Sequence, residues 1–142
     1  MEIWDSSAVL PLVFEQEPHS RRCRGAFAQR QAKAVAFVTR VECRSGIERL
    51  ARAGAVTPDQ RDRGIRALDD LLDEFDIVPF SSTVETRSLE LLARHELRAM
   101  DAMQLACAVV LRGGRAHRDV GFVCCDRRLA RAAAAEGVTL RL

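Results

Sequence analysis

The sequence predicts a single α/β domain over residues 1–142, with a central parallel β-sheet flanked by helices on both faces. A chain of 142 residues has the length of one domain. With 48% hydrophobic residues and a net charge of +2, it can bury an ordinary core, which excludes wholesale disorder. Short apolar segments alternate with longer helical patterns, and this alternation is typical of parallel strands joined by helical crossovers.

The first half of the chain contains two of the expected strands. We expect strands at 2–4 and 34–38, and helices at 8–14, 20–30, 41–53 and from 57–58 to about 75. The helix at 41–53 has an apolar stripe, and Gly54 just beyond its end is typical of a helix C-terminus. Thr57-Pro58 is typical of a helix start, because threonine caps the backbone and proline fits the first turn.

The second half continues the same alternation. We expect strands at 77–80, 121–125 and 138–142, and helices at 82–94, 101–112 and 127–136. Pro79 lacks a backbone N–H, so the strand at 77–80 is predicted at an edge of the sheet. Gly113-Gly114 ends one helix, and Gly137 separates the last helix from the last strand.

Several function classes are excluded by composition. No uncharged run approaches the roughly 18 residues of a membrane span, and the acids in the opening segment do not suit a secretory leader, so we expect a cytosolic protein without membrane contact. Five cysteines without a Cys-x-x-Cys pair and three scattered histidines predict neither a disulfide framework nor a zinc site. All basic residues except Lys33 are arginine, and the excess of arginine in 112–131 suits phosphate binding.

Carboxylates follow the predicted strands at positions where chemistry is expected. In an open parallel sheet, ligands bind outside the carboxyl ends of the strands. Asp5 and Asp126 directly follow strands, Glu42 lies in the first turn of a helix that follows one, and Asp101 opens the helix at 101–112. Four converging carboxylates repel one another unless a cation neutralises them, so the pattern favours a Mg²⁺ or Mn²⁺ site.

Each of these acids also has a structural interpretation. Asp5 and Asp126 suit helix N-caps, and Asp101 suits a first-turn acid that favours the helix dipole. Thr39-x-x-Glu42 has the form of a capping box. The hydroxyls of Ser6 and Ser7 could orient a metal-bound water or cap a helix. Both interpretations stay open for every residue, while the motifs of nucleotide cradles and serine hydrolases are absent.

Four segments resemble the motifs of PIN domains in the family's order. They are Ile3-Trp4-Asp5-Ser6-Ser7-Ala8, Val41-Glu42-Cys43, Leu97-Arg98-Ala99-Met100-Asp101-Ala102 and Phe122-Val123-Cys124-Cys125-Asp126-Arg127-Arg128-Leu129. The chain looks like the VapC-type toxins of bacterial type II toxin–antitoxin pairs, and the likeness covers essentially its whole length. It implies a PIN fold and a Mg²⁺- or Mn²⁺-dependent endoribonuclease. It further implies Asp5, Glu42, Asp101 and Asp126 as catalytic, metal-binding acids and Ser7 as a supporting polar residue.

The resemblance also implies binding partners, and two alternative functions stay open beside it. A VapC-type toxin would bind RNA as substrate, a small cognate antitoxin that covers the site, and a second copy of itself in a homodimer. The expected reaction is hydrolysis of an RNA phosphodiester by a metal-activated water. Two alternatives are a catalytically weak interaction module with the same fold and a metal-dependent DNA nuclease. One departure concerns Cys124, which stands where the family often has threonine or serine.

Overall fold

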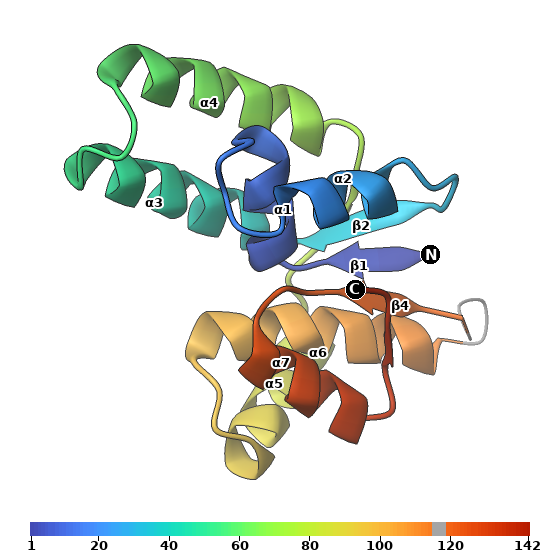
Figure 1. The fold of residues 1–142 in the computed structure, drawn as a ribbon. Coiled ribbons are helices and arrows are strands. Elements are labelled where there is room, and N and C mark those ends of the chain that lie inside the picture. The colour runs from blue at the N-terminus through green and yellow to red at the C-terminus, as the bar shows by residue number, and fades with distance from the viewer. Residues whose placement is uncertain (115–118) are drawn as a thin grey trace.

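The computed structural model describes residues 1–114 and 119–142, and in these residues five parallel strands form a central sheet (Figure 1). The strands are β1 (Glu2–Trp4), β2 (Lys33–Ala36), β3 (Asp76–Val78), β4 (Gly121–Val123) and β5 (Thr139–Leu140). Their order across the sheet is β3-β2-β1-β4-β5. The first strand is therefore the central one, with β2 and β3 on one side of it and β4 and β5 on the other.

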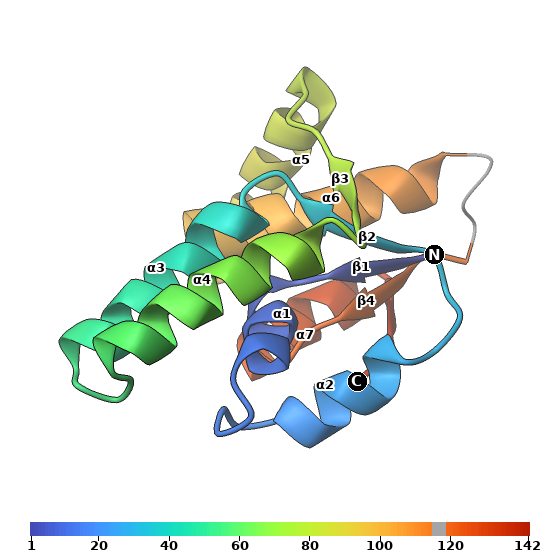
Figure 2. The same cartoon turned by 90° about the horizontal axis from the view of Figure 1, so that it is seen from above.

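Helices cover both faces of this sheet (Figures 1 and 2). The described helices are α1 (Ser6–Val13), α2 (Ser20–Phe27), α3 (Thr39–Arg52), α4 (Pro58–Leu72), α5 (Ser82–Arg94), α6 (Ala99–Gly113) and α7 (Arg127–Ala135). The first four lie on one face and the last three on the other. This arrangement confirms the predicted α/β class with a parallel sheet.

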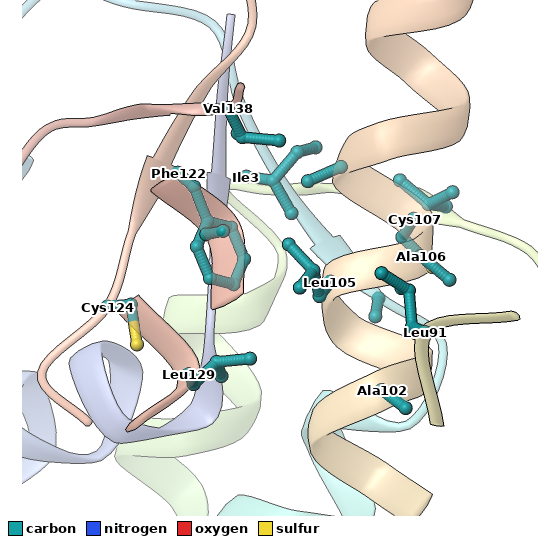
Figure 3. Close-up of a cluster of buried hydrophobic side chains, with 14 of the residues drawn as sticks. Ile3, Leu91, Ala102, Leu105, Ala106, Cys107, Phe122, Cys124, Leu129 and Val138 are labelled. Carbon is teal, nitrogen blue, oxygen red and sulfur yellow. The ribbon is translucent and has the colours of Figure 1, made fainter. Parts of the chain in front are cut away.

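Alternate residues of β1 supply two separate cores. Ile3 and Phe122 face the layer of α5, α6 and α7, where Leu105 and Leu129 close over them (Figure 3). Trp4 faces the other layer and makes edge-to-face contacts with Phe27 and Phe75, at centroid distances of 5.7 and 6.0 Å. Ile3 and Trp4 are both fully buried, as expected for a central strand covered on both faces.

The helix that follows β1 packs closely against the α3–α4 hairpin because of a glycine. A Cβ atom on Gly64 would lie 2.5 Å from Cζ of Phe14, so only glycine leaves room for that ring. This close approach packs the end of α1 against α4, in the core that contains Trp4. None of the helices in the described ranges is long and apolar enough to cross a membrane.

The starts of two helices differ by two residues from the prediction. The first helix begins at Ser6 instead of residue 8, because the Asp5 carboxylate accepts the Ser7 N–H and caps it. The helix predicted at 101–112 begins two residues earlier, at Ala99, so Asp101 lies within its first turn. The prediction of β3 at an edge is confirmed.

One local prediction is wrong. The sequence Thr39-x-x-Glu42 does not form a capping box, because Val38 is the N-cap of α3 and makes no side-chain cap bond. The Thr39 hydroxyl instead donates to the buried amide oxygen of Gln104 on α6. A tertiary contact has therefore replaced the local one. Residues 115–118, part of the predicted arginine-rich segment, lie outside the described residues.

Candidate functional site

The register of the sheet brings the ends of three strands to one edge. Trp4 pairs with Val35 on one side and with Val123 on the other, so the residues that follow these three strands leave the sheet at the same level. The Asp5 N–H donates to the Val123 carbonyl at 3.0 Å. Asp5 is thereby anchored at the centre of this edge, between the chain segments that lead to Glu42 and Asp126.

Asp5 is a buried carboxyl group with one uncompensated oxygen. Its side chain accepts the Ser7 N–H through Oδ2 at 2.9 Å, whereas Oδ1 is buried without a hydrogen-bond partner. Burial raises the pKa of Asp5 to about 6; the Ser7 hydrogen bonds oppose this rise, and the charges of Asp101 and Asp126 add to it. The structure therefore places Asp101 and Asp126 near enough to repel Asp5.

Glu42 shares this electrostatic environment from the first turn of α3. Burial raises the pKa of Glu42 to about 7, and the negative charges of Asp5 and Asp101 raise it further. Hydrogen bonds from Ser6 and Gln104 act in the opposite direction, because they stabilise the charged form. The four acids predicted from the sequence thus interact across one region, although they come from four separate segments.

Asp101 and Asp126 are more exposed and have compensating partners. Asp126 caps α7, and its Oδ1 accepts the N–H groups of Arg128 and Leu129 at 2.8 and 2.9 Å. Oδ2 of Asp101 lies 3.9 Å from the guanidinium Nη2 of Arg128, and its side chain is 20% exposed. The predicted capping role of Asp126 and first-turn position of Asp101 are both confirmed.

Ser7 and Cys124 pack around the Asp5 carboxylate. The Ser7 Oγ accepts the Cys125 N–H at 2.9 Å, which ties the start of α1 to the segment after β4. Sγ of Cys124 lies 3.9 Å from Oδ2 of Asp5 and 3.8 Å from Oγ of Ser7. Burial raises the pKa of the Cys124 thiol, so it stays protonated and acts as a weak donor.

Gln104 is a site residue that sequence reasoning missed. It is 1% exposed, and its amide donates to the Glu42 carboxylate and to the Ser6 hydroxyl. A signal was present, because Gln104 is the lone polar residue among the buried side chains of α6, one turn after Asp101. A buried polar side chain at such a position has partners, and those partners lie at the site.

The donor chemistry of this region fits a hard divalent cation. Within residues 1–114 and 119–142, no three His, Cys, Asp or Glu side chains are grouped closely enough to form a ready coordination shell. However, the unpartnered Oδ1 of Asp5 and the raised pKa values of Asp5 and Glu42 mark negative charge that the protein leaves uncompensated. Carboxylate oxygens are the preferred ligands of Mg²⁺ and Mn²⁺.

Comparison with known proteins agrees with the motif pattern. The PIN domain model matches residues 3–135, which confirms the resemblance drawn from the sequence. Among curated proteins, no relative matches the chain.

Solved structures share the fold at low sequence identity. FitAcB from Neisseria gonorrhoeae is 15% identical with a TM-score of 0.70, and the alignment covers 100% of this chain and 97% of that one. VapBC2 from Rickettsia felis, bound to a promoter DNA fragment, is 12% identical with a TM-score of 0.68 over 99% and 96% of the two chains. VapBC-5 from Mycobacterium tuberculosis is 19% identical with a TM-score of 0.61 over 98% and 95%.

Proposed function

The chain belongs to the PIN domain family, and we propose that it is a metal-dependent endoribonuclease that acts as the toxin of a type II toxin–antitoxin pair. PIN domains are generally nucleases, and the structural neighbours include FitAB and VapBC toxin–antitoxin proteins. The observation that carries the proposal is the buried, uncompensated Asp5 carboxylate, which three other acids surround at the carboxyl edge of the sheet.

The four acids would hold a Mg²⁺ or Mn²⁺ ion. Asp5 and Asp101 are proposed as the principal ligands, with Glu42 and Asp126 binding directly or through water. When bound, such an ion lowers the pKa of a water molecule and neutralises charge on the phosphate. Ser7 supports the site by fixing Oδ2 of Asp5 through its backbone N–H and by holding the segment after β4 through its hydroxyl.

Two arginines of α7 are suited to hold flanking phosphates, and one of them, Arg128, lies next to Asp101. Arg128 and Arg131 of α7 line a groove of about 440 Å³ together with His95, and Arg128 also approaches Asp101. Guanidinium groups bind phosphate oxygens through paired hydrogen bonds. Arg112, from the same arginine-rich segment, donates instead to the carbonyls of Glu136 and Gly137, so its role is structural.

The proposed partners are a cognate antitoxin and a second copy of the chain. Several structural neighbours are toxin–antitoxin complexes, which supports an antitoxin partner. The helices around residues 7–30 and 57–75 are proposed as the surfaces that bind these partners through their exposed side chains, because their buried apolar side chains belong to the core. In this proposal, the antitoxin covers the acids until it is removed.

Cleavage of matched substrates tests the proposal. We expect the purified chain with Mg²⁺ or Mn²⁺ to cut a structured RNA but not a DNA of the same sequence. EDTA should stop cleavage, and added Mn²⁺ should restore it. Asp101→Asn should abolish cleavage while its circular dichroism spectrum stays unchanged. Cleavage that persists in EDTA or in Asp101→Asn would contradict the proposed metal-dependent mechanism. Preferential cutting of DNA would favour the alternative of a metal-dependent DNA nuclease.

The toxin role has its own test in cells. Expression of the chain alone should arrest growth, and Asp101→Ala should relieve the arrest. An unaffected culture that accumulates active enzyme would contradict the toxin assignment while leaving the nuclease assignment intact.

A further inference from the structure

A single buried amide connects three helices at the site. Gln104 lies on α6, one turn after Asp101, and is 1% exposed. Its Oε1 accepts the Ser6 N–H and the Thr39 hydroxyl, both at 3.2 Å. Its Nε2 donates to the Ser6 hydroxyl at 3.1 Å and to Oε2 of Glu42. All four hydrogen-bonding positions of the amide are therefore used.

The orientation of this amide is dictated by its partners. The Ser6 backbone N–H can only donate, so it must meet the amide oxygen. With the amide oxygen fixed by this N–H, the amide nitrogen faces Oε2 of Glu42 and donates to it. A flipped amide would place its NH₂ group against the Ser6 backbone donor, and this buried pair would be repulsive. The network thus permits one arrangement only, and a group held in this way positions its neighbours.

We propose that Gln104 is a positioning residue of the nuclease site, which fixes the Glu42 carboxylate relative to Asp5 and Asp101 and thereby sets the affinity of the site for a divalent cation. The inference rests on the proposed function. Ser6 directly follows Asp5, and Asp101 lies on the helix of Gln104, so the amide ties three of the four acids together through short connections. Partners of this kind orient metal ligands, and their loss weakens metal affinity about 10- to 100-fold.

Calorimetric titration of metal-free protein with Mn²⁺ tests this role directly. Gln104→Met keeps the length of the side chain and removes the amide. We expect it to weaken Mn²⁺ binding at least about 10-fold. Gln104→Asn keeps a polar group in the core but is one methylene too short to reach Glu42 and Ser6 together. It should fold even if the methionine variant does not, and we expect a similar loss of affinity.

A double-mutant cycle separates positioning from general loosening of the fold. In a Glu42→Gln background the amide has no carboxylate to orient, so Gln104→Asn should change Mn²⁺ affinity by less than about twofold. Leu105→Ala is the control, because Leu105 is the next residue on α6 and is fully buried in the core of Figure 3. It should lower stability in urea by at least as much as either Gln104 variant, with Mn²⁺ affinity within about twofold of wild type.

Three results would overturn the inference. These are wild-type Mn²⁺ affinity in both Gln104 variants, an equal loss of affinity in Leu105→Ala, and an undiminished Gln104 effect in the Glu42→Gln background. Failure of the proposed function looks different, because wild type itself would then bind no Mn²⁺ or would bind it as well as Asp5→Asn does.

Discussion

The acids at the carboxyl edge of the sheet divide into an inner pair, Asp5 and Glu42, and an outer pair, Asp101 and Asp126. Burial, together with repulsion by neighbouring carboxylates, raises the pKa of both inner acids, to about 6 and about 7, and Oδ1 of Asp5 is buried without a hydrogen-bond partner in the described residues. The outer acids have partners of their own, since Asp126 caps α7 and Asp101 faces Arg128.

The difference between the pairs distinguishes a carboxylate that stabilises the fold from one whose burial suggests a role in function. Asp126 stabilises the start of a helix and would be favourable in a protein without any catalytic role. Asp5 caps α1 with Oδ2, but its Oδ1 is buried without a hydrogen-bond partner in the described residues, which costs free energy. Charge that a fold retains without compensation indicates a function, and Asp5 therefore carries most of the evidence for a cation site.

The largest expected effect follows removal of the inner charge. Asp5→Asn keeps an oxygen that accepts the Ser7 N–H, so the α1 cap should survive. We expect RNA cleavage to fall at least about 100-fold, because a principal cation ligand is lost. At pH 8 without metal, the free energy of unfolding should rise, because a buried charge has been removed. Initial cleavage rates and urea titrations measure the two effects, and a variant that loses stability at pH 8 would contradict the comparison.

The inner pair should also make the metal-free protein less stable as pH rises. The pKa of Asp5 is raised from 3.8 to about 6 in the folded state, so between these values the folded protein binds more protons than the unfolded chain. Stability conferred by the bound proton is full below about pH 4 and is lost as pH rises to about 6, by on the order of 3 kcal/mol for Asp5. Glu42 continues the decline toward pH 7.

Urea unfolding from pH 4 to pH 8 in EDTA measures this decline. Asp5→Asn should make the decline shallower between pH 4 and pH 6, leaving the contribution of Glu42, and millimolar Mn²⁺ should make it shallower in wild type by favouring the ionised carboxylates. A wild-type stability that increases over this range would show that the inner acids are compensated after all.

A smaller effect distinguishes the two roles of Asp126. Asp126→Ala should lower stability by about 1 kcal/mol, because two N–H groups of α7 lose their acceptor. Asp126→Ser keeps a capping oxygen and should recover most of that loss, yet both variants lack the carboxylate and should cleave RNA equally poorly. Recovery of activity together with stability in the serine variant would assign Asp126 to the helix alone.

The smallest effect is expected at Arg128. Its contact with Asp101 spans 3.9 Å between partly exposed groups, so Arg128→Ala should change stability by less than about 1 kcal/mol. If the guanidinium binds a phosphate of the substrate, the slope of log affinity against log salt should fall by about one. Binding to an uncleaved RNA in Ca²⁺, measured between 50 and 300 mM salt, decides this, and an unchanged slope would remove Arg128 from the interface.

Much of the fold, and the position of the four acids at strand ends and helix starts, could be predicted from the chain because these places leave local signals. Asp5 directly follows β1 and Asp126 lies three residues after the end of β4, and parallel topology alone assigns both to one edge. The failed capping box at Thr39 shows the limit of local patterns, since the same hydroxyl found a better partner on α6. Gln104 could not be assigned in this way, because its four hydrogen bonds join segments 62 to 98 residues apart in sequence.

The unequal sizes of Ile3 and Trp4 have a consequence for the placement of Asp5. A slip of β1 by one position would send the indole into the compartment shaped for isoleucine and leave a void among Phe27 and Phe75. The same slip would turn Asp5 away from its neighbours. The different sizes of these two apolar residues therefore fix the register of β1, and with it the position of the Asp5 carboxylate.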